Sequence, residues 1–304
     1  MTRWLDAADL RALDAAMRRA FATGDPSGLQ VLGYGEITTV VVCTSGGTPY
    51  ACKRLPPFPT SEQADRYAAV FEEYIETLAA SGVRVVPSQL ERLTADDGSV
   101  VLFCVQPVLP AGHLAVRVLE QSDAESARRL FELVLGHILS SVTPRVGLDG
   151  QLSNWMVEGD EILFLDVTTP MLKDAAGRDR LDTELFLAAV PVPVRPLFRR
   201  FVVPHVINQY HDPRSVVIDL LANLIKEGLE QHIAPFLELA NPRLSRPISE
   251  GEVRRYYEGD ARVWSAWQAM RRCDRFVRTR LLGKPYPFLL PGPIQRHGTR
   301  SGTR

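Results

Sequence analysis

The sequence predicts an α+β protein with a strand-rich N-terminal part and a larger helix-rich C-terminal part. Three observations support this prediction. Residues 28–105 contain β-branched and apolar runs separated by turn residues such as those at 45–47. Leu-Pro-Ala-Gly at 109–112 has the composition of a hinge. Beyond the hinge, apolar residues recur at helical spacing over 124–140, and residues 180–283 form helical stretches broken by prolines.

We expect four segments along the chain. Residues 1–27 contain an N-terminal helix, residues 28–108 form a small lobe with an antiparallel sheet, residues 109–294 form a helical lobe, and residues 295–304 are a disordered polar tail. The elements expected within the small lobe are a strand leading into Gly33, a hairpin over 38–55, a helix over 61–80 and strands over 83–86, 88–93 and 100–105.

Composition excludes several classes of protein. The chain has 304 residues, of which 45% are hydrophobic, and this is enough for two modest lobes that share a cleft. Its formal net charge of −1 provides no overall field for binding nucleic acid or an anionic membrane. No apolar run approaches the roughly 18 residues of a membrane-spanning helix, and the N-terminus lacks a signal-peptide core. We therefore expect a soluble, cytoplasmic protein.

The four cysteines are predicted to be free thiols. Cys43, Cys52 and Cys104 lie in apolar, strand-like runs, and Cys273 lies far from them in the sequence. No pair has the CxxC spacing typical of zinc sites. We interpret the three strand cysteines as small buried apolar residues.

Two features of the small lobe suggest phosphate binding. The first is the run Gly33-Tyr34-Gly35, because glycines allow backbone N–H groups to approach a phosphate closely. An ordinary turn between strands is the alternative for this run. The second is Lys53, on the strand that pairs back onto the glycine run. Its ammonium is a compact charge suited to phosphate oxygens, although an exposed strand lysine would have the same sequence pattern.

Two features of the larger lobe suggest a magnesium site and a hydroxyl substrate. Asp149 is followed five positions later by Asn154. In such a loop the carboxylate orients a hydroxyl group and the amide oxygen ligates the metal, although Asp and Gly also form simple turns. Asp166 ends the apolar run 162–165, where its carboxylate is suited to magnesium. Alternatively, Asp166 ends a strand and caps Thr168 or Thr169.

In this order, the glycine run, strand lysine, Asp-x4-Asn and strand-terminal Asp resemble the protein-kinase-like superfamily, and most closely its aminoglycoside and choline phosphotransferase branch. The resemblance covers residues 28–170 and implies a bilobal fold that binds ATP and Mg²⁺ between its lobes. It assigns phosphate binding to Gly33, Tyr34, Gly35 and Lys53, the catalytic base or hydroxyl-orienting group to Asp149, and the magnesium ligands to Asn154 and Asp166.

The resemblance implies two further contacts. The lysine should have a carboxylate partner on the following helix, where Glu72, Glu73 and Glu76 lie, and we choose Glu72. The adenine should lie against the connection Gln106 to Val108, where backbone groups would recognise it.

The sequence also departs from the family pattern. Thr38 replaces the third glycine, Gly147 stands where the family has histidine, and Val167-Thr168-Thr169 follows Asp166. Because Lys53, Asp149, Asn154 and Asp166 are all present, we favour an active phosphotransferase acting on a hydroxyl of a small molecule or peptide. The alternatives are a catalytically inactive, nucleotide-binding pseudokinase with a regulatory or scaffold role, and an enzyme of the same fold that transfers AMP.

Other polar residues allow more than one interpretation. His205 and His211 could line a substrate pocket. Arg271, Arg275 and Arg278 form a stripe at helical spacing, which is typical of a solvated helix face but would also suit an anionic partner. The sequence contains no motif that identifies the acceptor or the oligomeric state.

Overall fold

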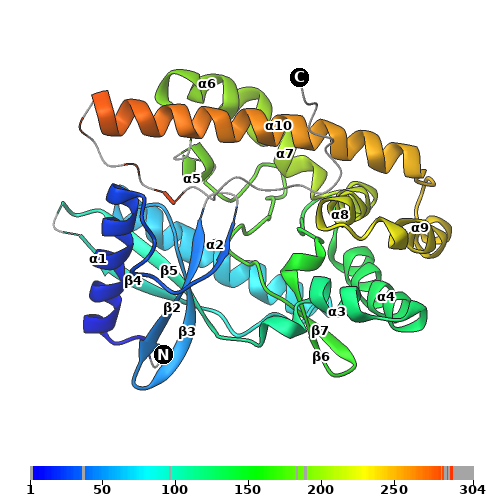
Figure 1. The fold of residues 1–304 in the computed structure, drawn as a ribbon. Helices are drawn as coiled ribbons and strands as arrows, with labels where there is room; N and C mark the ends of the chain where they lie inside the picture. Colours follow the sequence, from blue (N-terminus) through cyan, green and yellow to red (C-terminus); the bar gives the residue numbers. More distant parts are fainter. Residues whose placement is uncertain are drawn as a thin grey trace, which may run out of the picture.

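The computed structural model describes residues 3–35, 38–95, 97–182, 184–187, 190–281, 283, 286 and 288–289. Within these residues the chain is an α+β protein with a five-stranded antiparallel sheet and a larger set of helices (Figure 1). The strands are β1 (Val31–Tyr34), β2 (Thr39–Ser45), β3 (Thr48–Arg54), β4 (Gln89–Thr94) and β5 (Val100–Pro107), in the spatial order β1-β2-β3-β5-β4. The α+β class predicted from the sequence is therefore confirmed.

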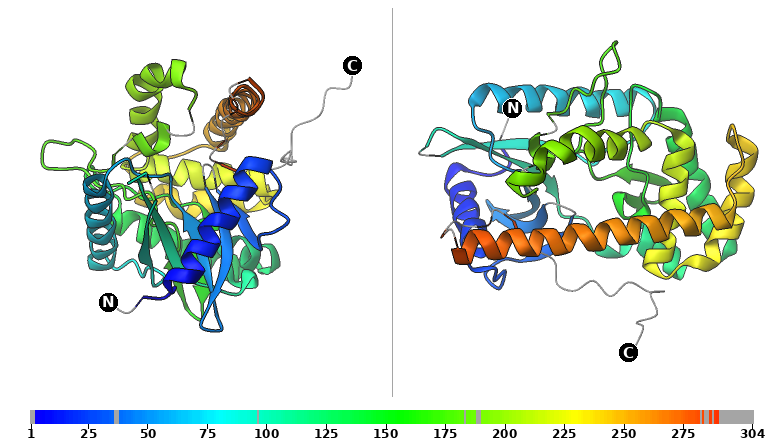
Figure 2. Two further views of the ribbon diagram at one scale, coloured as in Figure 1. Left: turned by 90° about the vertical axis from the view of Figure 1, so that its left-hand side faces the viewer. Right: turned by 90° about the horizontal axis from the view of Figure 1, so that it is seen from above.

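Successive side chains along each strand point to opposite faces of the sheet, and apolar side chains are found on both faces. On one face, Val101 and Phe103 of β5 pack with helix α1 (Ala7–Thr23). On the other, Leu102 and Cys104 belong to the cluster that contains helix α2 (Ser61–Ala80). The sheet therefore lies between α1 and α2, as the end-on view in Figure 2 shows.

Local sequence explains the bounds of both helices. The Asp6 carboxylate accepts hydrogen bonds from two backbone N–H groups at the start of α1, and Gly24 ends the helix with a left-handed φ of 75°. The cap of α2 is Thr60, whose hydroxyl accepts a hydrogen bond from the Gln63 N–H. The predicted span 61–80 of this helix is confirmed.

Among its described residues, the C-terminal part is helical apart from one hairpin. The hairpin consists of β6 (Trp155–Glu158) and β7 (Glu161–Phe164). The helices are α3 (Ala115–Gln121), α4 (Ala124–Ser141), α5 (Glu184–Leu187), α6 (Arg195–Leu197), α7 (Val203–Gln209), α8 (Pro213–Glu227), α9 (Ile233–Ala240) and α10 (Glu250–Phe276). Short helical turns cover Ala111–His113, Leu152–Asn154, Val192–Val194, Phe198–Val202, Glu230–His232, Asn241–Arg243 and Val277–Leu281.

A continuous core joins the sheet to the helices. Tyr74 of α2, Phe131 of α4 and Trp155 of β6 are each at most 1% exposed and belong to one apolar cluster. Helix α10 runs across both parts (Figures 1 and 2). Near its end, the Arg275 guanidinium donates to the Thr23 carbonyl of α1 over 3.4 Å.

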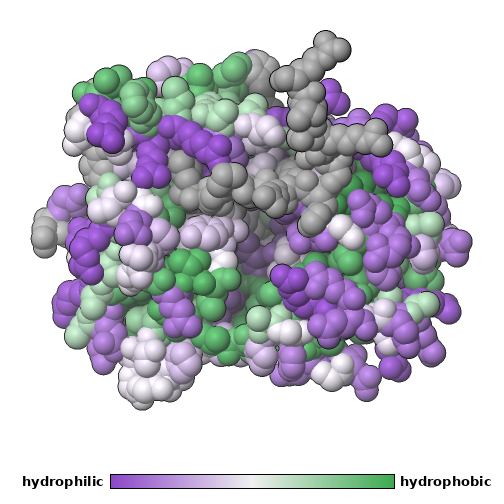
Figure 3. Space-filling view, in the orientation of Figure 1, coloured by the Kyte–Doolittle hydropathy of each residue, from purple (hydrophilic) through white to green (hydrophobic). Residues whose placement is uncertain are grey.

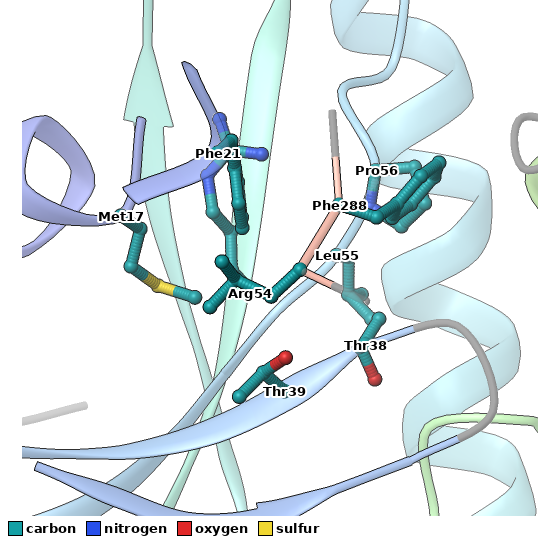
Figure 4. A pocket seen from close by; sticks show the side chains of 9 residues that line it. Met17, Phe21, Thr38, Thr39, Arg54, Leu55, Pro56 and Phe288 are labelled. Carbon is teal, nitrogen blue, oxygen red and sulfur yellow. The ribbon is translucent and has the colours of Figure 1, made fainter. Parts of the chain in front are cut away.

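The segment after α10 also reaches the sheet. Leu289 is 5% exposed and packs in the cluster of α1 and the sheet. Beside it, Phe288, Thr39 and Arg54 line a cavity of about 10 Å³, hardly enough for one water molecule (Figure 4). The C-terminal segment, which the sequence places in the helical lobe, therefore covers part of the sheet.

Several details differ from the sequence prediction. Residues 83–86 are not a strand, because Val86 donates instead to the Phe164 carbonyl at the end of β7. Gly33 and Tyr34 lie within β1 and not in a loop. The expected disordered tail, 295–304, lies outside the described residues. Within the described part of the chain, no helix is both long and apolar enough to cross a bilayer.

Candidate functional site

The sheet presents Lys53 towards the helical part. Lys53 lies on β3 between Val40 of β2 and Cys104 of β5, so strands support it on both sides. Its Nζ lies 2.9 Å from Oδ1 and 3.0 Å from Oδ2 of Asp166. The lysine side chain is 18% exposed and the aspartate side chain is 33% exposed. The two predicted residues therefore form an ion pair that solvent still reaches.

Asp166 follows β7 and also organises the next turn. Its Oδ1 accepts hydrogen bonds from the Thr168 N–H over 3.2 Å and from the Thr168 hydroxyl over 2.7 Å. Burial favours the neutral carboxyl, but the Lys53 ammonium and the hydrogen bonds outweigh burial and lower the pKa of Asp166. The carboxylate is thus ionised at neutral pH, and it both caps Thr168 and pairs with Lys53.

The β6–β7 hairpin places the Asn154 backbone against Leu165, the residue before Asp166. Trp155 pairs with Phe164, and the next contact along the hairpin joins the Leu165 N–H to the Asn154 carbonyl over 2.8 Å. The Asn154 side chain donates through Nδ2 to the Asp149 carbonyl over 3.3 Å. A single hairpin and its preceding loop therefore carry Asp149, Asn154 and Asp166, and hydrogen bonds join neighbouring parts of this unit.

The loop that carries Asp149 is held from several directions. Asp149 is half-buried, and its Oδ1 accepts from the Gln151 N–H over 3.2 Å. The preceding Leu148 N–H donates to the Tyr210 carbonyl over 3.1 Å. Gly147 donates to the Met171 carbonyl over 2.8 Å. These bonds fix the backbone on which the Asp149 carboxylate is mounted.

Two tyrosines of α2 donate hydrogen bonds to the segments that contain Asp166 and Asp149. The Tyr67 hydroxyl donates to the Thr168 carbonyl, and the Tyr74 hydroxyl donates to the Gly147 carbonyl, each over 2.9 Å. Burial raises the pKa of both tyrosines well above the usual value, and the Asp166 charge raises both further. The Asp149 charge also raises the pKa of Tyr74. Both hydroxyls therefore remain protonated donors.

Sequence reasoning missed these tyrosines. They lie seven positions apart and so share one face of α2, together with Phe71 and Leu78. Their spacing within an apolar stripe was the available signal, since a buried tyrosine hydroxyl needs a partner.

The predicted pairing of Lys53 with Glu72 requires correction. Glu72 is exposed, and the Lys53 ammonium donates instead to both carboxylate oxygens of Asp166. The face of α2 that packs inward carries Tyr67, Phe71 and Tyr74, so Glu72 projects away from it. Neighbouring Glu73 forms an ion pair with Arg180.

Gln106 ties the sheet to the segment before Asp166. Its Nε2 donates to the Leu165 carbonyl over 2.8 Å and to the Ser88 hydroxyl over 2.9 Å. Val108, the other residue predicted near the adenine, follows β5 and is half-buried. The Gln106 side chain thus has a positioning role that sequence reasoning did not anticipate.

The glycine run forms the end of the β1–β2 hairpin. Gly33 pairs with Val40, Tyr34 pairs with Thr39, and the Gly35 N–H donates to the Thr38 carbonyl over 2.8 Å. A Cβ atom on Gly35 would lie 3.1 Å from the Thr38 carbonyl, whereas the space beside Gly33 is open and Tyr34 is 46% exposed. Residues 36 and 37 lie outside the described part.

Gly147 occupies the position where the resemblance implies histidine. A Cβ atom there would lie 2.8 Å from the Met171 Cβ and 2.9 Å from Cε1 of His211. His211 is 7% exposed, and burial lowers the pKa of its imidazole. The His211 ring, from the turn before α8, therefore fills the space beside Gly147.

A buried polar cluster supports the loop from the helical side. Asp219 of α8 accepts from the Gln151 amide and the Tyr256 hydroxyl, each over 2.9 Å. Burial raises the pKa of Asp219. Because Gln151 is two residues from Asp149, this cluster connects α8 and α10 to the Asp149 loop.

The carboxylate oxygens of Asp166 are suitable ligands for a hard cation such as Mg²⁺. Among the described residues there is no group of three or more His, Cys, Asp or Glu side chains that could hold a metal. Magnesium does not need one, because it often binds through one or two carboxylates plus phosphates and water. Asp166 Oδ2 accepts a hydrogen bond from the Lys53 ammonium over 3.0 Å, which leaves its second lone pair for a metal ion.

The fold and site thus define an α+β protein in which a strand lysine meets a hairpin carboxylate between a sheet and a helical part. A family of unknown function (DUF6206) matches residues 12–275, and the chain belongs to that family. No curated protein matches the chain. The matched span contains Lys53, Asp149, Asn154 and Asp166 and extends from α1 to α10.

Proposed function

We propose that this protein is an ATP- and Mg²⁺-dependent phosphotransferase of the protein-kinase-like type. It transfers the γ-phosphoryl group to a hydroxyl of a small molecule or peptide. The observation that carries the proposal is the Lys53–Asp166 ion pair, formed between the sheet and the same loop–hairpin unit that holds Asp149 and Asn154. These are the residue types that phosphoryl transfer requires in one place.

Each residue has a separate role in the proposal. Lys53 binds phosphate oxygens through its ammonium. The oxygens of Asp166 and Asn154 hold Mg²⁺, which neutralises phosphate charge when bound. Asp149 orients the acceptor hydroxyl and accepts its proton. Catalysis then depends on positioning and on compensation of charge.

The structure offers a physical reason why metal and nucleotide would bind together. Without them, the Lys53 ammonium neutralises the Asp166 carboxylate at 2.9 Å. A divalent cation at Asp166 repels the ammonium, and phosphate oxygens attract it. If ATP bound without magnesium, its phosphates would draw Lys53 away from Asp166. The Asp166 carboxylate would then have no cation beside it. We therefore expect strongly magnesium-dependent ATP binding.

Calorimetric titration of ATP, with and without Mg²⁺, tests the proposal. Wild-type protein should bind MgATP, and both Lys53→Met and Asp166→Asn should weaken binding by at least about tenfold, the usual loss for one charge-assisted contact. Asp149→Asn should bind MgATP with the wild-type affinity. It should lose the slow hydrolysis of ATP that occurs when water takes the place of the acceptor hydroxyl. Absence of ATP binding by the wild-type protein in both conditions would exclude the proposed function.

A nucleotide-binding protein without turnover is the second candidate. It is favoured by the exposed position of Glu72, since Lys53 then lacks the helix carboxylate that the resemblance implies. Asp149→Asn distinguishes the candidates. An enzyme loses ATP hydrolysis in this variant, whereas a regulatory protein binds MgATP and shows no hydrolysis in either form.

A further inference from the structure

A groove that contains three cationic side chains lies beside segment 143–146, which leads into the Asp149 loop, and outside the site described above. It has a volume of about 490 Å³, within the range of small-molecule sites. Its walls come from α2, from the turn at 143–146 and from the segment 172–180. The cations that line it are Arg145, Lys173 and Arg180.

The acidic residues of the groove are already paired. Glu73 forms an ion pair with Arg180. Asp174 accepts from the Arg178 guanidinium over 2.8 Å and from the N–H groups of Ala176 and Arg178. The hydrogen bonds from Arg178 lower the pKa of Asp174. Neither carboxylate therefore competes strongly for a further cation.

The cations are not fully compensated. Arg145 is exposed, and within the described part of the chain its guanidinium has no hydrogen bond or ion pair. Lys173 is held in place, with a side chain 11% exposed, a hydrogen bond to the Asn208 amide oxygen and Asp179 at 3.8 Å. Because Lys173 is fixed and Arg145 is available, the groove favours an anion.

We propose that this groove binds the phosphate group of a small ligand, either inorganic phosphate or a phosphate ester. Arg145 supplies a planar, multidentate donor, and Lys173 supplies a fixed point charge. The Thr143 hydroxyl accepts from the N–H groups of Arg145 and Val146, so its own hydrogen is left to donate to the ligand.

The groove is connected to the Asp149 loop through the backbone. Lys173 N–H donates to the Arg145 carbonyl over 2.9 Å, and Gly147 N–H donates to the Met171 carbonyl over 2.8 Å. A phosphate bridging Arg145 and Lys173 therefore joins the segment before Asp149 to the segment after Asp166. The inference does not depend on the proposed phosphotransferase activity.

Calorimetric titration of the protein with inorganic phosphate, and separately with glycerol phosphate, tests the site. Arg145→Ala removes only a side chain, since the backbone bonds of Arg145 remain, and should weaken binding about three- to tenfold, as for loss of one charged hydrogen-bond donor. Glu73→Gln removes the ion-pair partner of Arg180, which leaves that guanidinium available to the phosphate, and should strengthen binding. Preference for the ester over inorganic phosphate identifies a phosphorylated ligand, and equal affinity identifies free phosphate.

Two controls separate this site from others. Arg128→Ala on α4 removes a cation of similar exposure, paired with Glu132, and should leave phosphate binding unchanged. Lys53→Met removes the phosphate-binding group proposed for the other site, so the part of the binding that depends on Arg145 should remain in this variant. Binding that is lost in Lys53→Met but kept in Arg145→Ala would assign the phosphate to the other site and overturn the inference. Absence of saturable binding at millimolar phosphate would overturn it as well.

Discussion

Lys53 and Asp166 are 113 positions apart in the sequence, yet their charged groups meet at 2.9 Å between the sheet and the helical part. The lysine is mounted on a central strand and the aspartate on the end of a hairpin. Gln106 donates to the carbonyl of Leu165, the residue immediately before Asp166. The ion pair is therefore placed by elements that are themselves fixed on both sides.

Acid stability provides a test of this ion pair. Because the pKa of folded Asp166 lies below its unfolded value, its contribution to stability is present above the unfolded pKa, about 3.9, and is lost as the pH falls through the folded pKa. Lys53→Met removes the attraction, so burial should raise the pKa. We expect the variant to lose about 1–2 kcal/mol at pH 7, a value reduced because solvent reaches a third of the carboxylate.

Urea unfolding at pH 7 and pH 3 measures this effect. The difference in unfolding free energy between wild type and Lys53→Met should be smaller at pH 3 than at pH 7, because pH 3 lies below the unfolded pKa of about 3.9 and part of the contribution of the ion pair is then lost. A difference that stays constant with pH would contradict the ionic interpretation and point to lost packing of the lysine stem.

The α2 tyrosines give a second prediction. Tyr74→Phe leaves the buried Gly147 carbonyl without its side-chain donor and should cost about 1–2 kcal/mol. Tyr34→Phe is the matched control, because Tyr34 is 46% exposed on β1. Urea midpoints should separate the two variants clearly. Equal midpoints would show that the Tyr74 hydroxyl contributes nothing to stability.

Gly147 gives a third prediction. An alanine Cβ at this position would lie 2.8 Å from Met171 Cβ and 2.9 Å from His211 Cε1, so Gly147→Ala should destabilise the protein by about 1–3 kcal/mol. His211→Ala should relieve part of the clash, so the double variant should be more stable than the sum of the single effects predicts. Strict additivity in thermal or urea unfolding would show that His211 does not restrict Gly147.

Local patterns in the sequence were sufficient for much of the fold. The apolar stripe of α2 and its polar cap region gave the span 61–80, and the β-branched run before Ser45-Gly46-Gly47 gave the β2–β3 hairpin. Residues 83–86 were predicted wrongly because their apolar run pairs with β7 through one short bridge. Such a long-range contact leaves no periodic pattern in the sequence.

The candidate site was predictable to a similar degree. The order of the motifs suggested that Asp149, Asn154 and Asp166 belong to one site, but the β6–β7 hairpin that connects them was not predicted. The partner of Lys53 was not predictable, since three glutamates on α2 were available and helix rotation decides which of them faces inward. That rotation depends on how Tyr67 and Tyr74 pack, and so on tertiary contacts that no local pattern encodes.

The C-terminal segment provides the last prediction, because it connects α10 to the sheet. Leu289 packs with α1 and the sheet at 5% exposure, and Figure 4 shows neighbouring Phe288 close to Leu55 and Pro56 after β3. Leu289→Ala should cost about 2–4 kcal/mol, as for other buried leucines. Leu281→Ala, at 69% exposure, is the control and should change little.

Hydrogen exchange locates the effect of Leu289→Ala. If this segment fastens the outer face of the sheet, amide protection should fall first in α1 and β2, while α8, in the core of the helical part, should retain its protection. The surface in Figure 3 is mostly hydrophilic over the helical part at the right of the view. A uniform loss of protection through α8 would mean instead that sheet and helices unfold as one unit, with Leu289 contributing only to global stability.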